Sequence, residues 1–557
     1  MKIILAQQNY HIGNFEGNRV KIVSAIQEAV KKKADLIVFS ELAVCGYPPR
    51  DFLEFSDFIR SCHESLQTIA GYSREIGILI GCPTINPLKE GKDLFNSVYL
   101  LHDGRIGDVI HKTLLPTYDV FDEYRYFEPA AEWHVMEFKG YKLAVTVCED
   151  IWNLGDNPLY RICPMDKLKQ QSPDIMINLS ASPFDYRHSV HRLDVIRANV
   201  RKYQLPLLYC NTVGSQTEIV FDGASIACNP DGTLVALAES FREQLLEVTW
   251  KDGSLFSEEQ SSIGTENENV DQNFDPEYQT ASIYHALILG IRDYFSKMGF
   301  RKAILGSSGG IDSALTQVLA TEALGADQVT AVLLPSAFSS THSVDDAIQL
   351  SKNLGNPFYQ ISIEPVFQSL LNQLKPVFGN LPFSLAEENL QSRSRGNLLM
   401  GIANKLNFIL LNTSNKSECA TGYGTLYGDM AGGISVLGDV YKTQVYALAR
   451  YVNREKERIP LSILEKAPSA ELRPGQKDSD SLPPYPVLDT ILYQYIEQRK
   501  GPSEITAMGY ERSLVDRILK LVNNSEYKRN QFCPVIRVSP KSFGVGRRIP
   551  IVARYLS

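Results

Sequence analysis

The sequence predicts an α/β protein made of two domains. Its 557 residues exceed what one hydrophobic core normally organises. Short apolar runs alternate with helical stretches in both halves, which is typical of sheets covered by helices. Between the halves, residues 251–278 are polar, acidic and poor in apolar residues, as expected of a linker. We therefore expect one domain over residues 1–250, a linker over residues 251–278 and a second domain over residues 279–557.

The candidate strands of the first domain are short apolar runs separated by longer helical stretches. They are KIILAQ (2–7), DLIVFSEL (35–42), GILIG (77–81), SVYLL (97–101), KLAVTVCED (142–150), DIMINLS (174–180) and LPLLYCN (205–211). The second domain begins with a helical pattern from Thr280, and its candidate strands alternate with helices, which favours a parallel sheet. These strands are AIL (303–305), QVTAVLLP (328–335), FYQISI (358–363) and NFILLNT (407–413). Residues 468–486 are rich in Pro, Asp, Ser and Gly, which predicts a mobile loop.

The composition excludes several classes of protein. A hydrophobic content of 44% and a charged content of 22% are typical of a soluble globular protein. The net charge of −8 argues against a general nucleic-acid-binding protein, and no apolar stretch approaches the ~20 residues that span a bilayer. The nine cysteines include no C-x-x-C pair, which fits buried thiols in a reducing compartment. We therefore expect a cytoplasmic protein without nucleic-acid or membrane partners.

A phosphate-binding loop is predicted at residues 307–314 (SSGGIDSA), between the apolar run AIL and a helical stretch over residues 311–324. Backbone N–H groups converge in a glycine-rich loop at a helix N-terminus, where the helix dipole also favours an anion. No Gly-Lys-Ser/Thr follows, so the loop is not a Walker A motif. The loop resembles that of the ATP pyrophosphatases, which cut ATP between its α and β phosphates. The resemblance implies ATP contacts at Gly306, Ser307, Ser308, Gly309, Gly310, Ile311, Asp312 and Ser313.

Three reactive residues of the first domain follow or lie near apolar runs: Glu41, Lys112 and Cys148. Their contexts are FSELAVCGYPPRD, HKTLLPTYDVFDEYRYF and VTVCEDIW. Together these segments resemble the nitrilase superfamily, and its glutaminase branch in particular. The resemblance covers most of residues 1–250 and implies an αββα sandwich with a Glu-Lys-Cys triad. A thiolate is a better nucleophile than water, so Cys148 would attack an amide, with Glu41 as base and Lys112 stabilising the oxyanion.

The same resemblance implies residues that bind glutamine. Tyr118 and Ser182 match a tyrosine and a serine that contact glutamine in the family. The family often has a lysine six residues beyond that serine, whereas this sequence has His188, and Arg192 is a further candidate for the substrate carboxylate. Glu123 and Glu128 are both candidates to support the triad, and the sequence does not distinguish them.

Motifs of the second domain extend the phosphate-loop interpretation. The segments are EENLQSRSRGNLLMGIANK (387–405), LLNTSNKSECATGY (410–423), TLYGDMAGGISVLGDVYKTQVY (425–446) and EYKRNQ (526–531). Together they resemble the NAD synthetase family over nearly all of residues 280–557. The resemblance implies an ATP contact at Thr413, deamido-NAD⁺ contacts at Asn389, Glu418 and Lys528, and Mg²⁺ ligands at Asp312 and Glu418. Lys442 and Ser336 are weaker candidates, and Ser414 and Gly438 depart from the residues common in the family.

The two resemblances together imply one reaction sequence. Deamido-NAD⁺ would be adenylated by ATP with Mg²⁺, and ammonia released from glutamine would convert the acyl-adenylate to NAD⁺, with glutamate, AMP and pyrophosphate as the other products. Two sites on one chain suggest a protected route for ammonia, and the family implies a homo-oligomer, from dimer to octamer. The alternatives are another ATP-pyrophosphatase amidotransferase, an ammonia-only NAD synthetase with an inactive first domain, and a binding protein built on a decayed nitrilase domain.

Overall fold

The structure of the chain is a computed structural model that describes residues 1–155, 158–258, 276–469, 471–473, 476, 478–480 and 482–556, the side chains of Ser189 and Val190 excepted. The chain divides into two compact units, residues 1–274 and 275–557. None of the described helices combines the length and the apolar character needed to cross a bilayer.

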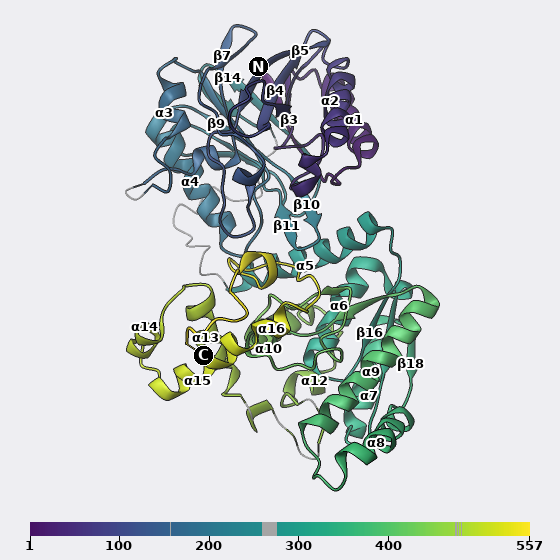
Figure 1. Ribbon diagram of the computed structural model, residues 1–557. Helices are drawn as coiled ribbons and strands as arrows, with labels where there is room; N and C mark the ends of the chain where they lie inside the picture. Colours follow the sequence, from purple (N-terminus) through teal and green to yellow (C-terminus); the bar gives the residue numbers. More distant parts are fainter. Residues whose placement is uncertain are drawn as a thin grey trace. The chain divides into compact units, whose positions relative to one another are not determined.

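The described part of the first unit is built from two large sheets with helices packed against them (Figure 1). Its described strands form one sheet in the order β15-β14-β1-β2-β3-β4-β5, a second in the order β13-β12-β9-β8-β7-β6, and the ribbon β10-β11. The strands are β1 (Lys2–Gln7), β2 (Leu36–Val38), β3 (Gly77–Ile85), β4 (Leu94–His102), β5 (Arg105–His111), β6 (Met136–Phe138), β7 (Tyr141–Val147), β8 (Ile175–Ser180), β9 (Leu207–Asn211), β10 (Val213–Gln216), β11 (Ile219–Asp222), β12 (Ile226–Cys228), β13 (Leu234–Leu237), β14 (Gln244–Lys251) and β15 (Ser254–Phe256). The helices are α1 (Phe15–Lys31), α2 (Ser56–Ala70), α3 (Pro164–Lys169) and α4 (His188–Tyr203), with short 3₁₀ helices η1 (Arg50–Glu54), η2 (Glu123–Arg125) and η3 (Cys148–Ile151).

Alternate residues of the central strands pack into different layers, because side chains along a strand point to opposite faces. Leu5 of β1 and Val145 of β7 share the core between the two sheets. The neighbouring residue Ile4 packs instead with Ile26 of α1, and Met176 of β8 packs with α4. Both faces of these strands are therefore buried, which explains why they read as continuous apolar runs. The predicted αββα sandwich is confirmed.

The first unit extends past residue 250, where the sequence suggested that the linker begins. β14 runs to Lys251 and pairs antiparallel with β15, with Trp250 opposite Leu255. The connecting residues Asp252 and Gly253 both have positive φ, 51° and 80°, as a tight hairpin turn requires. An Asp-Gly pair between strands is a hairpin signal, so the sequence did contain this information. Residues 259–275 of the expected linker lie outside the described residues, and α5 already begins at Pro276.

The second unit contains a parallel sheet in the order β18-β17-β16-β19-β20 (Figure 1). Its strands are β16 (Ala303–Gly306), β17 (Val329–Leu333), β18 (Phe358–Gln360), β19 (Ile409–Asn412) and β20 (Ile434–Ser435). Its helices are α5 (Pro276–Met298), α6 (Ile311–Leu324), α7 (Thr341–Leu354), α8 (Glu364–Phe378), α9 (Leu385–Leu406), α10 (Lys416–Thr421), α11 (Lys442–Val452), α12 (Leu461–Glu465), α13 (Tyr485–Ile496), α14 (Pro502–Ala507), α15 (Arg512–Asn524) and α16 (Glu526–Arg529). β16 and α6 follow one another at the centre of the sheet, so the predicted strand-loop-helix unit is confirmed.

Helix α10 is fixed against the C-terminal segment by a buried lysine. The Lys416 ammonium lies 2.8 Å from Glu497 and 2.9 Å from Asp439, and donates a hydrogen bond of 2.7 Å to the Ser539 hydroxyl. Burial lowers the pKa of Lys416, but the two carboxylates outweigh burial and raise it. Lys416 therefore stays charged, and α10 carries Glu418 on a rigid support.

Candidate active sites

The nucleophile candidate Cys148 directly follows β7 and is the first residue of η3. Its φ is 41°, a left-handed conformation that is strained for a side chain other than glycine. The side chain is buried, and Asn178 donates a hydrogen bond of 3.4 Å to the Cys148 carbonyl. Burial and the carboxylate of Glu41 raise the pKa of the Cys148 thiol well above its usual range, against the opposing effect of Lys112. The resting thiol is therefore neutral at physiological pH, and a base must remove its proton before it can attack.

Glu41 and Lys112 meet next to this cysteine, joined by Glu123. The Lys112 ammonium is 2.7 Å from Glu41 Oε1 and 2.8 Å from Glu123 Oε1. Glu41 follows the end of β2, Lys112 follows β5 and Glu123 begins η2, so three separate elements supply the cluster. Burial lowers the pKa of Lys112, but the two carboxylates raise it well above its usual value. Burial and the charge of Glu41 raise the pKa of Glu123 to about 7, although Lys112 opposes the shift.

The structure distinguishes the two glutamates that the sequence left open. Glu123 lies in the cluster, where Tyr47 donates a hydrogen bond of 2.7 Å to its Oε1. Glu128 is elsewhere: its Oε2 accepts a hydrogen bond of 2.8 Å from the Lys92 backbone N–H. Of the two, Glu123 is therefore the glutamate that contacts Lys112.

The predicted glutamine-binding residues lie near the segment that follows Cys148. Tyr118 donates hydrogen bonds of 3.0 Å to both carboxylate oxygens of Glu149, the residue after the nucleophile. The Ser182 hydroxyl is 2.8 Å from His188 Nε2, and the His188 ring stacks on Trp152 with centroids 4.9 Å apart.

Arg192 has a different partner from the one that the sequence suggested. Its buried guanidinium forms hydrogen bonds of 2.8 and 3.1 Å with the two carboxylate oxygens of Asp222. A bidentate pair of this kind satisfies a guanidinium strongly. His188 is thus the basic residue of the two that contacts Ser182.

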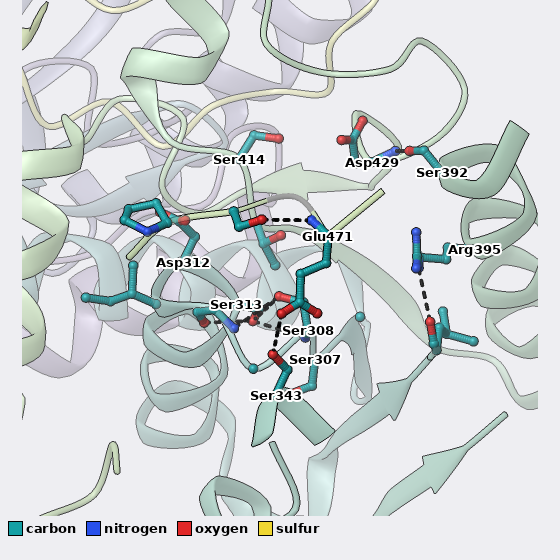
Figure 2. Close-up of a pocket in the computed structure, with 18 of the residues that line it drawn as sticks. Ser307, Ser308, Asp312, Ser313, Ser343, Ser392, Arg395, Ser414, Asp429 and Glu471 are labelled. Carbon is teal, nitrogen blue, oxygen red and sulfur yellow. Dashed lines mark hydrogen bonds between the residues drawn. The ribbon is translucent and has the colours of Figure 1, made fainter. Parts of the chain in front are cut away.

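The second unit contains a cavity of about 290 Å³ around the predicted phosphate loop (Figure 2). All eight predicted loop residues, Gly306 to Ser313, line it, as do Thr413 and Glu418. The loop is tight: Ser313 Oγ lies 3.1 Å from Ser308 Oγ and donates to the Gly310 carbonyl at 3.0 Å. Gly309 has φ of 74°, and a Cβ there would lie 2.2 Å from the Ser343 carbonyl oxygen. The backbone of the loop therefore lies directly against the first turn of α7.

Two carboxylates and a lysine meet at the start of α6 and α10. Lys442 forms an ion pair with Asp312 and lies 3.9 Å from Glu418. Asn415 donates a hydrogen bond of 3.0 Å to Asp312 and caps α10 by accepting from the Glu418 N–H. Burial and the charge of Asp312 raise the pKa of Glu418 to about 8, although Lys442 opposes the shift. A cation placed between the carboxylates would favour the charged form of Glu418.

This donor set fits Mg²⁺. Mg²⁺ usually binds one or two protein carboxylates and completes its coordination with phosphate oxygens and water. Asp312 and Glu418 line the cavity that contains the phosphate loop. Among the residues that the structure describes, no group of three or more His, Cys, Asp or Glu side chains is arranged to hold a metal ion. The protein would therefore contribute two carboxylates, and ATP would contribute the rest.

Three predicted residues of the second unit do not line the cavity: Asn389, Lys528 and Ser336. Asn389 and Lys528 converge on one segment, since Asn389 accepts a hydrogen bond of 2.8 Å from Thr425 and Lys528 donates to the carbonyls of Gly422 and Gly424, both at 2.7 Å. They fix the course of residues 422–425 beside the cavity. Ser336 stabilises the turn before α7, where its hydroxyl accepts from the Phe338 N–H at 3.3 Å.

The two departures from the family pattern have different settings. Ser414 lines the cavity, and its N–H donates a hydrogen bond of 3.0 Å to Asn412. Gly438 packs closely, because a Cβ there would lie 2.7 Å from Ser435 Oγ and 3.0 Å from Val535. In this chain a side chain at position 438 would have to displace Ser435 and Val535.

Comparison with known proteins agrees with this pair of sites. The carbon-nitrogen hydrolase family model matches residues 2–252, and the NAD synthase family model matches residues 283–532. The glutamine-dependent NAD⁺ synthetase of Synechocystis is 44% identical over 99% of both chains, and that of Thermotoga maritima is 40% identical over 100% of this chain and 99% of the relative. The chain belongs to the glutamine-dependent NAD⁺ synthetases. A solved structure of a synthetase of this family from Acinetobacter baumannii, in complex with ADP, superposes with a TM-score of 0.77 at 37% identity, covering 99% of this chain and 98% of the other.

Several residues of the two sites were not predicted from the sequence. Asn96 in the Glu41 cluster, and Arg395, Lys466, Glu471 and Asp478 around the cavity, are the main ones. Figure 2 shows Glu471 pointing toward the serines of the phosphate loop, and its carboxylate accepts a hydrogen bond of 2.7 Å from Ser343. Lys466, Glu471 and Asp478 lie outside the motifs of the second domain, and only the fold brings them to the cavity. Arg395 lies within the motif of residues 387–405, but nothing in the sequence singled it out.

Proposed function

We propose that this chain amidates deamido-NAD⁺ to NAD⁺ with ATP, using ammonia that it releases from glutamine. The observation that carries the proposal is the pairing on one chain of a buried Glu-Lys-Cys cluster and a phosphate-loop cavity with two facing carboxylates. Each arrangement suits one half of the reaction. The glutaminase would occupy the first unit, residues 1–274, and the synthetase the second unit, residues 275–557.

The glutaminase step begins with a proton transfer. Glu41 takes the proton of the neutral Cys148 thiol, and the thiolate attacks the carboxamide carbon of glutamine. The ammonium of Lys112, held charged by Glu41 and Glu123, stabilises the oxyanion, together with the backbone N–H that follows Cys148. As the tetrahedral intermediate collapses, the protonated Glu41 gives its proton to the departing nitrogen, so the C–N bond breaks, ammonia leaves and a thioester remains. Glu41 then activates water, which hydrolyses the thioester to glutamate.

Glutamine is held by the groups on either side of this cysteine. Tyr118, Ser182 and His188 would contact the substrate, with the His188 imidazole as the proposed contact for its carboxylate. The negative charge of Glu149 beside Tyr118 complements the substrate ammonium.

The synthetase step joins a carboxylate to AMP. The nicotinate carboxylate attacks the α-phosphate of ATP, pyrophosphate leaves, and ammonia then displaces AMP from the acyl-adenylate. The N–H groups of residues 306–313 and the N-terminus of α6 would bind the phosphates, with Thr413 as a further ATP contact. Mg²⁺ held by Asp312 and Glu418 would neutralise phosphate charge. Asn389, Glu418 and Lys528 are the proposed contacts for deamido-NAD⁺, with Lys442 available to the phosphates.

Assembly and compartment are part of the same proposal. We propose a homo-oligomer, from dimer to octamer, and exposed apolar side chains at Leu381, Phe383 and Leu385 offer surface for contacts between copies. The cytoplasm fits a chain whose nine cysteines are all free thiols and whose substrate is ATP.

The test compares the wild-type chain with Cys148→Ala, using deamido-NAD⁺, ATP and Mg²⁺ with either glutamine or ammonium. We expect the wild type to form NAD⁺ from both nitrogen sources and Cys148→Ala to form it from ammonium alone. If the wild type forms no NAD⁺ with either source, the proposed acceptor is wrong. If it uses ammonium but never glutamine, the glutaminase assignment is wrong.

A further inference from the structure

Asn96 is a buried amide that contacts both carboxylates of the glutaminase cluster. It lies on β4 with no exposed surface, and its backbone carbonyl accepts a hydrogen bond of 2.8 Å from the Lys112 N–H. Its side-chain Nδ2 donates to Glu41 Oε1 at 2.7 Å and to Glu123 Oε2 at 3.5 Å. The Lys112 ammonium also donates hydrogen bonds to both glutamates, to Oε1 of Glu41 and to Oε1 of Glu123.

The donors are distributed unequally between the two glutamates. Glu41 accepts from Lys112 at 2.7 Å, from Asn96 at 2.7 Å and from the Ala181 N–H at 3.0 Å. Glu123 accepts from Lys112 at 2.8 Å and from Tyr47 at 2.7 Å, whereas its contact with Asn96 is at the limit of a hydrogen bond. Hydrogen bonds to a charged carboxylate favour that form, so the short Asn96 contact favours a charged Glu41 more than a charged Glu123.

The unequal hydrogen bonding matters because the two glutamates share a limited number of protons. Two carboxylates share a single ammonium in a site closed to water, and carboxylates in one buried site do not both ionise easily. One proton is therefore available to the pair, and only the glutamate without it can act as a base. The other titratable groups that interact electrostatically with the pair are Cys148, Glu149, Tyr47 and Tyr160.

We propose that Asn96 is a positioning residue that selects Glu41, rather than Glu123, as the base of the glutaminase. An amide suits this role because it donates N–H bonds and cannot itself take or release the proton. Its Oδ1 is buried and accepts no hydrogen bond from the described residues, so the carboxylates alone fix the orientation of the amide. The inference rests on the glutaminase activity proposed above.

The experiment measures the pH dependence of kcat/KM for glutamine hydrolysis in the wild type and in Asn96→Leu. The acid limb of this profile reports the base of the free enzyme. Without the amide, the charged form of Glu41 loses a short donor, so protons bind it at higher pH. We expect the acid limb to move up by about one pH unit, with a fall of about tenfold in kcat at pH 6. KM for glutamine and ammonium-driven NAD⁺ formation should stay near the wild-type values.

Tyr47→Phe is the matched control. It removes a donor from Glu123 and none from Glu41, so the shared proton should prefer Glu123 even more strongly. We expect its acid limb to stay in place or to move down, which is the opposite of the Asn96→Leu result. If the two substitutions only loosened the site, the acid limbs of Asn96→Leu and Tyr47→Phe would not move in opposite directions.

The outcomes distinguish this inference from the function on which it rests. If the wild type hydrolyses no glutamine, both the proposed glutaminase function and the role of Asn96 are wrong. A wild type that hydrolyses glutamine, with the same acid limb in Asn96→Leu, overturns the role of Asn96 alone. Should Asn96→Leu not fold, Asn96→Ser takes its place, because its shorter side chain also withdraws the short donor from Glu41. An acid limb shared by Asn96→Ser and the wild type overturns the proposal in the same way.

Discussion

At the scale of single residues, the glutaminase site depends on charges that are placed against each other in a closed core. The cysteine is neutral because burial and Glu41 disfavour its thiolate. The lysine is charged because two carboxylates compensate for its burial. These opposite results follow from the same surroundings, since a buried charge persists only where a partner offsets the lost hydration. Under the proposed function, the charged Lys112 is therefore ready to stabilise an oxyanion, and the nucleophile would form only when Glu41 accepts a proton.

The carboxylate of Asp150 holds the two sides of this site together. Its Oδ1 accepts from the Thr113 and Leu114 N–H groups at 3.1 and 2.8 Å, and its Oδ2 accepts from the Val147 N–H at 3.0 Å. One side chain thus ties the residue after Lys112 to the residue before Cys148. In Asp150→Asn, an NH₂ group would face a backbone N–H, so the two segments would move apart. We expect kcat for glutamine hydrolysis to fall at least tenfold, measured by glutamate release, because small displacements of catalytic groups are costly.

The control for Asp150→Asn is Asp174→Asn at the other end of β7. Asp174 is exposed and accepts a hydrogen bond of 2.8 Å from the Lys142 N–H, so it also caps a strand but far from the nucleophile in sequence. Its variant should keep wild-type glutaminase activity. Equal losses in both variants would mean that the effect is a general weakening of β7.

At the scale of elements, the phosphate loop, which precedes α6, depends on its close contact with the first turn of α7. Gly309→Ala would force a Cβ against the Ser343 carbonyl and place alanine at a φ of 74°. The left-handed conformation alone costs roughly 1–2 kcal/mol, and the clash adds to it. We expect kcat/KM for ATP in ammonium-driven NAD⁺ formation to fall more than tenfold, with glutamine hydrolysis unchanged.

Gly325→Ala separates the clash from the backbone strain. Gly325 ends α6 with a φ of 92°, and a Cβ there would meet no atom within 4 Å. Its variant carries the strain without the contact with α7, so its ATP kinetics should remain close to wild type. A Gly309→Ala variant that is no worse than Gly325→Ala would show that the contact with Ser343 is not needed.

The elements also show what the sequence could reveal. Buried strands such as β1, β8 and β17 were predicted because their apolar runs stand out, and α6 was predicted with its observed bounds. β5 was missed, because its sequence RIGDVIH is mostly polar and only one of its residues is buried. The short strands β10, β11 and β15 contain too few residues to form a pattern. Their position depends on pairing with distant segments, which local periodicity does not record.

The site residues also divide into those that a local sequence motif reveals and those that only the fold brings together. Glu41, Lys112 and Cys148, and the residues of the phosphate loop, lie in local motifs and could be found from the sequence. The choice of Glu123 over Glu128 could not, because both stand in one polar segment and only the fold brings one of them to Lys112. Asn96 gave no signal either, because an asparagine on a strand has no recognisable chemistry until Glu41 lies beside it.

At the scale of the whole molecule, the proposed function divides the chemistry between a step that would use side chains alone and a step that would use Mg²⁺. The glutaminase cluster works with a base, an ammonium and a thiol, all supplied by side chains. The synthetase cavity offers two carboxylates and a phosphate loop to a substrate that carries several negative charges. We therefore expect charge neutralisation by Mg²⁺ to matter for synthesis in the second unit and not for glutamine hydrolysis in the first.

Metal removal tests this division. With EDTA in excess, we expect NAD⁺ formation from ammonium to stop, because Asp312 and Glu418 would repel the phosphates of ATP when no cation lies between them. Basal hydrolysis of glutamine, measured without ATP, should keep its rate, and added Mg²⁺ should restore NAD⁺ formation. Glu418→Gln should need at least tenfold more Mg²⁺ for half-maximal synthesis, because one of its two carboxylate ligands is lost. Loss of basal glutamine hydrolysis on chelation would instead place a metal requirement in the first unit, and the division would be wrong.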